Sequence, residues 1–96
     1  MTDKEYVSYI WHLKVEDDLD WSFCSRVLRQ DGYDVSKEEI KTIFKRFFTD
    51  LVGIAPYSKC PECGEWLMPR RNVHGYFVGC ITYQKCKFVA FEKTGG

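Results

Sequence analysis

Hydrophobic side chains in the first 55 residues recur at helical spacing. A stripe at positions i, i+3 and i+4 is typical of an amphipathic helix whose apolar side packs on a core. The apolar positions of the three expected helices are, in order, Tyr6, Val7, Ile10, Trp11 and Leu13; Phe23, Cys24, Val27 and Leu28; and Ile40, Ile43, Phe44, Phe47, Phe48, Leu51 and Val52. Residues 1–55 are therefore predicted to form a small three-helix unit.

Capping and turn residues mark the ends of these helices. Thr2 or Asp3 can cap the first helix, and the acidic segment 16–20 suits the loop and first turn of the second, where negative charge meets the positive end of the helix dipole. Ser36 and Glu39 form a capping-box pattern at the start of the third. The second helix should stop near Asp31-Gly32, and the third at Gly53 and Pro56.

The pattern changes after Pro56. Residues 57–93 have no helical period and contain three short apolar runs, 66–68, 76–78 and 88–91, separated by Pro, Gly and Asn. Such runs predict a small antiparallel sheet. The whole chain is thus expected to be α+β, with a helical domain over 1–55, a small sheet domain over 57–93 and a frayed tail over 94–96.

Composition narrows the class of protein. The chain of 96 residues is 45% hydrophobic and 17% aromatic, which excludes a disordered tail. No apolar run approaches the roughly 20 residues that span a membrane. The first residues are polar and mixed in charge, unlike a signal peptide. We expect a cytoplasmic or nucleoid-associated protein that is not secreted and does not contact a membrane.

Four of the five cysteines fall in the last 37 residues, with the spacing Cys60-x2-Cys63-x16-Cys80-x5-Cys86. An odd count without a secretory signal argues against a disulfide framework. Gly64 follows the first pair, as expected in a tight turn whose amides point at thiolates. Two such half-sites can surround one Zn²⁺ tetrahedrally, at Zn–S distances of about 2.3 Å. Four protein ligands leave no open position, so the predicted zinc is structural.

The same four cysteines also allow alternatives to a four-cysteine zinc site. They are two disulfides, four buried thiols, an iron–sulfur cluster, or replacement of one cysteine by His74. The fifth cysteine, Cys24, lies at helical spacing and is expected to be a small buried hydrophobe. A catalytic thiol there would need His12 or His74 as its base. Because the sequence has no paired carboxylates at a recognisable spacing and no phosphate loop, we expect that the protein is not an enzyme.

Residues 60–90 resemble the C-terminal zinc fingers of type IA DNA topoisomerases. The matching positions are Cys60-Pro61-Glu62-Cys63-Gly64, Leu67, Arg70 or Arg71, Gly75-Tyr76-Phe77-Val78-Gly79-Cys80, Tyr83 and Cys86-Lys87. Gln84 stands where the family pattern has proline. The resemblance implies a zinc ribbon that binds DNA, preferentially single-stranded. It does not extend to the helical half.

The charge distribution agrees with this implication. Residues 1–58 hold eight basic and eleven acidic side chains, and residues 59–96 hold six and three, so the neutral total hides balances of −3 and +3. Single-strand binders combine cations with aromatic faces on which bases stack. The predicted nucleic-acid-binding residues are Trp66, Arg70, Arg71, Tyr76, Tyr83, Lys85 and Lys87. Because Tyr76 and Phe77 must point to opposite faces of a strand, one of the two is expected in the core.

A protein partner is the main alternative. The acidic segment 16–20 would repel phosphate and suits a protein surface. A small accessory or inhibitory protein, docked on a polymerase or another nucleic-acid enzyme through its ribbon and acidic half, would have such a sequence. The basic side of the third expected helix is either a helix-turn-helix reader or a solvated face; its residues are Lys37, Lys41, Lys45 and Arg46.

Overall fold

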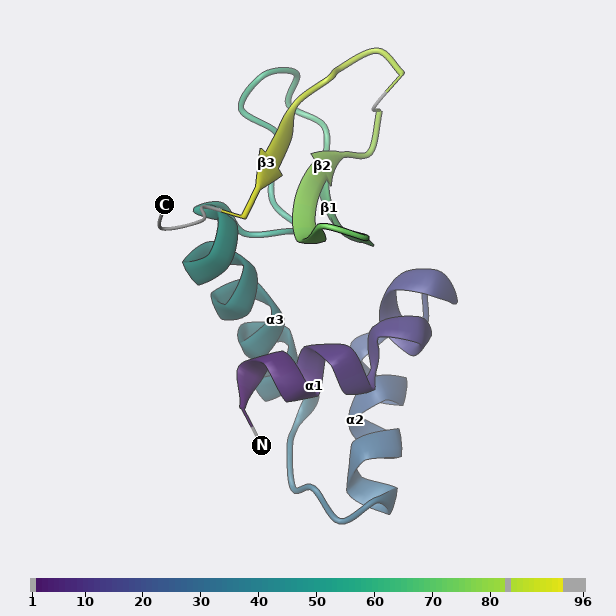
Figure 1. Cartoon of the computed structure of the whole chain (residues 1–96). Helices are drawn as coiled ribbons and strands as arrows, with labels where there is room; N and C mark the ends of the chain where they lie inside the picture. The colour runs from purple at the N-terminus through teal and green to yellow at the C-terminus, as the bar shows by residue number, and fades with distance from the viewer. Residues whose placement is uncertain (1, 83, 93–96) are drawn as a thin grey trace. The chain divides into compact units, whose positions relative to one another are not determined.

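The computed structural model describes residues 2–82 and 84–92. Helices occupy the N-terminal part and a three-stranded antiparallel sheet follows, so the predicted α+β class is confirmed (Figure 1). The elements are α1 (Asp3–Tyr9), the π-helical turn η1 (His12–Glu16), α2 (Trp21–Gln30), α3 (Lys37–Val52), β1 (Leu67–Asn72), β2 (Gly75–Cys80) and β3 (Val89–Phe91). The chain divides into two compact units, Met1–Phe47 and Phe48–Gly96. Within the described residues, no helix is both long and apolar enough to cross a membrane.

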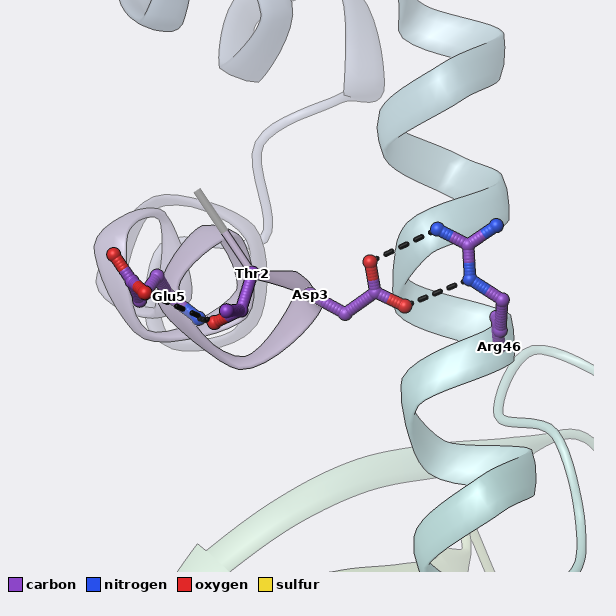
Figure 2. A network of polar contacts seen from close by, with 4 residues as sticks. All are labelled: Thr2, Asp3, Glu5 and Arg46. Atoms are coloured by element: carbon purple, nitrogen blue, oxygen red, sulfur yellow. Dashed lines mark hydrogen bonds and ion pairs between the residues drawn. The ribbon is translucent and has the colours of Figure 1, made fainter.

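The three α-helices α1, α2 and α3 begin at side-chain caps. Thr2 Oγ1 accepts the amide of Glu5 at 3.2 Å (Figure 2). Ser36 Oγ accepts the amide of Glu39 at 3.1 Å, so both predicted caps are confirmed. Asp20, at the end of the acidic segment, accepts the amide of Phe23 at 2.8 Å and so caps α2. Each cap satisfies an amide that has no partner inside its own helix, which fixes where the helix starts.

The first helix is shorter than the apolar pattern indicated. Leu13 was expected to continue it, but Leu13 lies in the separate π-helical turn η1, where the amide of Asp17 donates to the carbonyl of His12 at 2.9 Å. A π-turn takes in one more residue than an α-turn, so it shifts the apolar positions that follow. In this turn Lys14 is buried, with its ammonium 4.7 Å from the centroid of the Trp21 ring.

The core of the first unit is built from α1, α2 and α3. Its buried apolar side chains are Val7, Ile10, Trp11, Cys24, Leu28, Val35, Ile40, Ile43 and Phe44. Phe44 packs edge-on against Trp21, with ring centroids 5.2 Å apart. Cys24 is fully buried, as expected for a small hydrophobe, and burial raises the pKa of its thiol. Phe23 does not share this core, because 40% of its surface is exposed.

One ion pair joins α1 to α3 inside the first unit. Arg46 donates from Nε and from a terminal nitrogen to the two carboxylate oxygens of Asp3, at 2.7 and 2.9 Å (Figure 2). These hydrogen bonds hold the pKa of Asp3 below its usual range. The sequence pattern did not predict the pair, because its members lie 43 positions apart.

The second unit begins with the last turns of α3. Gly53 follows that helix with a φ of 87°, a left-handed conformation that glycine adopts without strain. The sheet order is β1-β2-β3, both pairings are antiparallel, and Leu67 lies opposite Cys80. The turn between β1 and β2 is closed by Asn72, whose side chain accepts the amide of His74 at 2.8 Å.

The register of the strands gives the sheet two different faces. On one face Leu67, Pro69, Val78 and Cys80 are fully buried. Tyr76 lies on this same face and packs edge-on against Phe48 at 5.9 Å between ring centroids. We call the opposite face the open face. Its residues, from β1, β2, β3 and their immediate ends, are Trp66, Met68, Arg70, Asn72, Gly75, Phe77, Gly79, Ile81, Val89 and Phe91.

Candidate metal centre and nucleic-acid interface

The first cysteine pair lies in a tight turn just before β1. Lys59 pairs with Trp66 across this turn, the amide of Cys60 donates to the carbonyl of Glu65, and the amide of Gly64 donates to the carbonyl of Cys60 at 2.9 Å. Gly64 has a φ of 79°, where a residue with a Cβ would be strained. The glycine after the second cysteine therefore has the role that the sequence predicted.

The second pair is held by the end of the sheet. Cys80 is the last residue of β2, and its amide donates to the carbonyl of Phe88 at 3.2 Å. Cys86 follows a turn in which its amide donates to the carbonyl of Thr82 at 2.7 Å. Backbone pairing thus fixes both cysteines, although they come from a strand end and a loop.

The four sulfur atoms come together in one cluster, with every Sγ within 4.8 Å of every other. Cys63 Sγ is 3.4 Å from Cys80 Sγ, and Cys60 Sγ is 3.7 Å from Cys86 Sγ. A tetrahedral site with Zn–S bonds of about 2.3 Å has an S–S edge of about 3.8 Å. The cluster has the donor set and the dimensions to hold one zinc ion, which confirms the predicted cofactor. His74 lies in the exposed turn between β1 and β2, apart from this cluster.

Without a cation, the thiol of Cys86 resists ionisation. The backbone amide of Phe88 has the largest single effect on the pKa of Cys86 and lowers it, but desolvation and the thiols of Cys63, Cys60 and Cys80 together raise it to about 12. A divalent cation removes this obstacle, since thiolates and not thiols are its ligands. All five cysteines are among the described residues, and all are free thiols rather than disulfides.

A hydroxyl that the sequence analysis did not single out supports the centre. Thr82 Oγ1 lies 3.1 Å from Cys80 Sγ and 3.7 Å from Cys63 Sγ. When the sulfurs are thiolates only the hydroxyl can donate, so Thr82 becomes an outer-sphere donor that orients Cys80. In the sequence, Thr82 could have been identified as a supporting residue because it lies two positions after the cysteine ligand Cys80.

The predicted nucleic-acid-binding residues do not all share one surface. Trp66 is 47% exposed, and the ammonium of Lys59 lies 4.0 Å from the centroid of its ring. Arg70 is exposed on the open face, whereas Arg71 lies on the other face with its guanidinium 5.8 Å from the ring of Tyr76. Lys85 and Lys87 are exposed beside the second cysteine pair. Tyr83 lies outside the described residues.

The open face also carries apolar side chains that the sequence analysis did not name as site residues. Phe77 and Phe91 lie side by side, with ring centroids 5.2 Å apart and planes tilted by 32°. Phe91 is 60% exposed and Ile81 is 50% exposed. Phe77 could be noticed from the sequence as the alternate of Tyr76, but Phe91 joins it only through the pairing of β2 with β3.

Arg70 lies at the centre of this face, over Gly79. A Cβ built on Gly79 would lie 3.5 Å from Arg70 Nε, in ordinary van der Waals contact, so the arginine side chain covers this glycine. Two shallow pockets meet at Arg70. One, of about 360 Å³, is lined by Arg70, Asn72, Phe77, Gly79, Val89 and Phe91. The other, of about 410 Å³, is lined by Arg70, Ile81, Thr82, Gln84 and Lys85.

Residues 57–95 match the family model described as the topoisomerase DNA binding C4 zinc finger. The chain is 53% identical over 30 residues to DNA topoisomerase 1 of Methanothermobacter thermautotrophicus, and 48% identical over 29 residues to DNA topoisomerase 1 of Methanocaldococcus jannaschii. These matches cover 31% and 30% of this chain but only 4% of either relative. DNA topoisomerase 1 of Helicobacter pylori is 30% identical over 60 residues, 62% of this chain and 8% of that protein. No solved structure matches the chain.

These matches confirm the resemblance seen in the cysteine segment. The second part of the chain is a topoisomerase-type four-cysteine zinc ribbon. The chain spans less than a tenth of the length of the relatives that it matches. The likeness is therefore to a small fragment of each topoisomerase.

Proposed function

We propose that this protein is a non-enzymatic zinc-binding module that binds single-stranded DNA on the open face of its ribbon. The observation that carries this proposal is the pair formed by the half-buried Phe77 and the exposed Phe91, which line one pocket with Arg70. Unpaired bases stack on exposed aromatic rings, at about 1–3 kcal/mol per base, while arginine contacts phosphate or stacks in turn. In a duplex the bases are already stacked on one another and their faces are not available, which is why we favour the single strand.

The charge of the ribbon predicts weak and salt-sensitive binding. Residues 59–96 have a side-chain balance of +3, and a zinc ion with four thiolates contributes −2. Few phosphates are then neutralised, so base stacking has to supply much of the binding free energy. The electrostatic part should weaken as the salt concentration rises. Arg70 and Lys85 line the same pocket, which suits the sugar–phosphate path of a strand whose bases lie on the phenylalanines.

Arg70 and Arg71 lie on opposite faces of the sheet, so substituting each in turn tests whether DNA binds on the open face. Arg70→Ala should reduce affinity for a fluorescein-labelled oligothymidine by about tenfold, because it removes a charged contact from the open face. Arg71→Ala removes the same charge from the other face and should change affinity less than twofold at the same low salt. Fluorescence anisotropy measures both. Equal losses in the two variants would show that the open face is not the binding surface, and the absence of binding by the parent protein would end the proposal.

The aromatic contribution is tested separately. Phe91→Ala should weaken binding to the single strand by about five- to a hundredfold, as expected for one lost stacking contact. Because Phe91 is 60% exposed, this change should leave zinc content unaltered and lower thermal stability only slightly, through the lost contact with Phe77. An unlabelled duplex of the same sequence should compete poorly for the parent protein. A duplex that competes as well as the single strand would contradict the strand preference.

A protein partner for the helical unit is a second candidate. Phe23 is 40% exposed and lies three residues after the acidic segment 16–20. Together they would suit a basic protein surface with an apolar contact. A pull-down with the full chain after nuclease treatment should recover one stoichiometric protein, and Phe23→Ala should reduce its recovery. Recovery of nucleic acid alone before nuclease, and of nothing after it, would reject this candidate.

A further inference from the structure

The first unit contains a polar pocket that plays no part in the zinc ribbon. It has a volume of about 410 Å³ and lies between α2 and the start of α3. Its lining residues are Ser22, Ser25, Arg26, Arg29, Ser36, Lys37 and Glu38. Three of these side chains are cationic, three are serines and one is a carboxylate. Such a lining suits neither an apolar ligand nor a metal cation.

The pocket has a well-defined wall. Four of its residues occupy positions i, i+3, i+4 and i+7 of α2 and therefore share one face of that helix. Ser25 Oγ donates to the carbonyl of Val35 at 2.5 Å, and Arg29 Nε donates to the same oxygen at 3.2 Å. These two bonds tie the segment before α3 to α2, so the two sides of the pocket are held together.

The cations of the pocket are available to a ligand. Among the residues that the structure describes, Arg26, Arg29 and Lys37 are in no ion pair. Arg29 uses Nε for Val35 and keeps both terminal nitrogens, which form one edge of the planar guanidinium fork. Against the three positive charges stands the single carboxylate of Glu38.

We propose that this pocket binds a phosphate group. A phosphate presents several strong acceptors, which match two guanidinium groups, one ammonium and the hydroxyls of Ser22 and Ser36. The hydroxyl of Ser25 already donates to Val35. The start of α3 adds a partial positive charge on the same side. The carboxylate of Glu38 opposes the anion, so affinity for inorganic phosphate alone should be modest. This proposal does not depend on nucleic-acid binding by the ribbon.

Titration of the zinc-loaded full chain with inorganic phosphate, followed by ¹H–¹⁵N NMR at constant ionic strength, tests the site. Saturable shifts should be confined to α2 and to the amides of residues 36–38. Arg26→Ala and Lys37→Ala should each raise the dissociation constant by about tenfold, the effect of removing one charged hydrogen bond. Lys41, like Lys37, belongs to α3, but it is exposed and lies outside the pocket. Lys41→Ala should therefore change the dissociation constant less than twofold.

A second titration, with a short oligonucleotide that lacks terminal phosphates, distinguishes a phosphodiester ligand from a phosphate monoester or free phosphate. Shifts at the pocket with this probe would identify a phosphodiester backbone as the ligand, and shifts with inorganic phosphate alone would identify a phosphate monoester or free phosphate. Residue-specific shifts keep this result separate from binding at Phe77 and Phe91. An equal response of the Arg26→Ala/Lys37→Ala double variant, or no saturable shift at the pocket with either probe, would overturn the proposal.

Discussion

The helical unit and the ribbon are stabilised in different ways. The first has a continuous apolar core in which side chains such as Phe44 and Leu28 are fully buried, and its helices begin at side-chain caps. The second has three short strands, one of them only three residues long, and an open face that leaves apolar side chains exposed. A domain this small usually needs a metal, a disulfide or oligomerisation to fold. The comparison indicates that the metal replaces the part of the core that the ribbon lacks, which leaves one sheet face free for a ligand.

The largest expected effect is that of zinc removal. Structural zinc in such modules contributes roughly 10–16 kcal/mol, which is folding free energy for a sheet this small. Chelation of the full chain should therefore abolish the dispersed amide resonances of β1 and β2 and leave those of α1 and α2 in place. Metal analysis of the purified protein should give one zinc per chain.

Cysteine variants provide the control for this prediction. Cys80→Ser should lose the zinc, whereas Cys24→Ala should retain it, because Cys24 belongs to the core of the other unit. If β1 and β2 kept their amide dispersion after chelation, the sheet would not depend on the metal. The contrast between the two units would then be lost.

A substitution in the apolar core should destabilise the helical unit without affecting the zinc site. Phe44 is fully buried and packs on Trp21, so Phe44→Ala should lower the free energy of unfolding of that unit by about 3–5 kcal/mol. Urea unfolding followed by helical circular dichroism measures this loss. Zinc content should stay at one per chain.

An exposed phenylalanine of the same unit serves as the control. Phe23→Ala removes the same side chain from a position that is 40% exposed, and it should change stability by no more than about 0.5 kcal/mol. A loss of zinc in the Phe44→Ala variant would mean that the ribbon depends on the helical core after all.

A smaller effect is expected from the hydroxyl beside the metal ligands. Thr82→Val keeps the shape of the side chain but removes the donor to Cys80, and such outer-sphere changes typically lower metal affinity about 10- to 100-fold. Competition with a chromophoric chelator measures the affinity for zinc. Thr42→Val, which removes a hydroxyl bonded to a carbonyl within α3, should leave zinc affinity unchanged. Equal affinities in the parent and Thr82→Val proteins would exclude the outer-sphere role.

Local signals in the sequence predicted much of this structure. The caps at Thr2 and Ser36 and the turn glycine at Gly64 depend on neighbours within three or four residues, so their residue types were sufficient evidence. The four cysteines were recognisable because their spacing matches two half-sites of one tetrahedron. In each case the interacting groups are near in sequence or carry unmistakable chemistry.

Features set by long-range packing were not accessible in this way. The π-turn at η1 and the exposure of Phe23 depend on how the helices of the first unit pack. Whether Tyr76 or Phe77 faces the core could not be read from alternation, which gives two faces without saying which is covered. The contact of Tyr76 with Phe48 and the pairing that brings Phe91 beside Phe77 answer that question.

The smallest expected effect concerns the ion pair that joins α1 to α3. Both members are partly solvent-exposed, so the pair should contribute no more than about 1 kcal/mol despite its two hydrogen bonds. Because Arg46 lowers the pKa of folded Asp3, the contribution is present above the usual carboxyl pKa of 3.8 and is lost as pH falls through the lower, folded value. Asp3→Asn should thus destabilise the helical unit at pH 7, and this effect should diminish as pH falls below 3.8 and through the folded value.

Urea unfolding followed on the methyl resonances of Val7 and Ile10 reports on this unit alone, which matters because the thiolates of the ribbon are protonated in acid and release the metal. Asp34→Asn removes an exposed carboxylate that is in no ion pair among residues 2–82 and 84–92, so it controls for the change in net charge. A difference between Asp3→Asn and the parent protein that persisted unchanged at pH 2 would show that the asparagine acts through helix capping or packing. A difference in stability that disappears as the carboxyl group is protonated identifies the ion pair as its cause. If the helical unit remains folded after the pair is lost, α1 is held to α3 mainly by the apolar core.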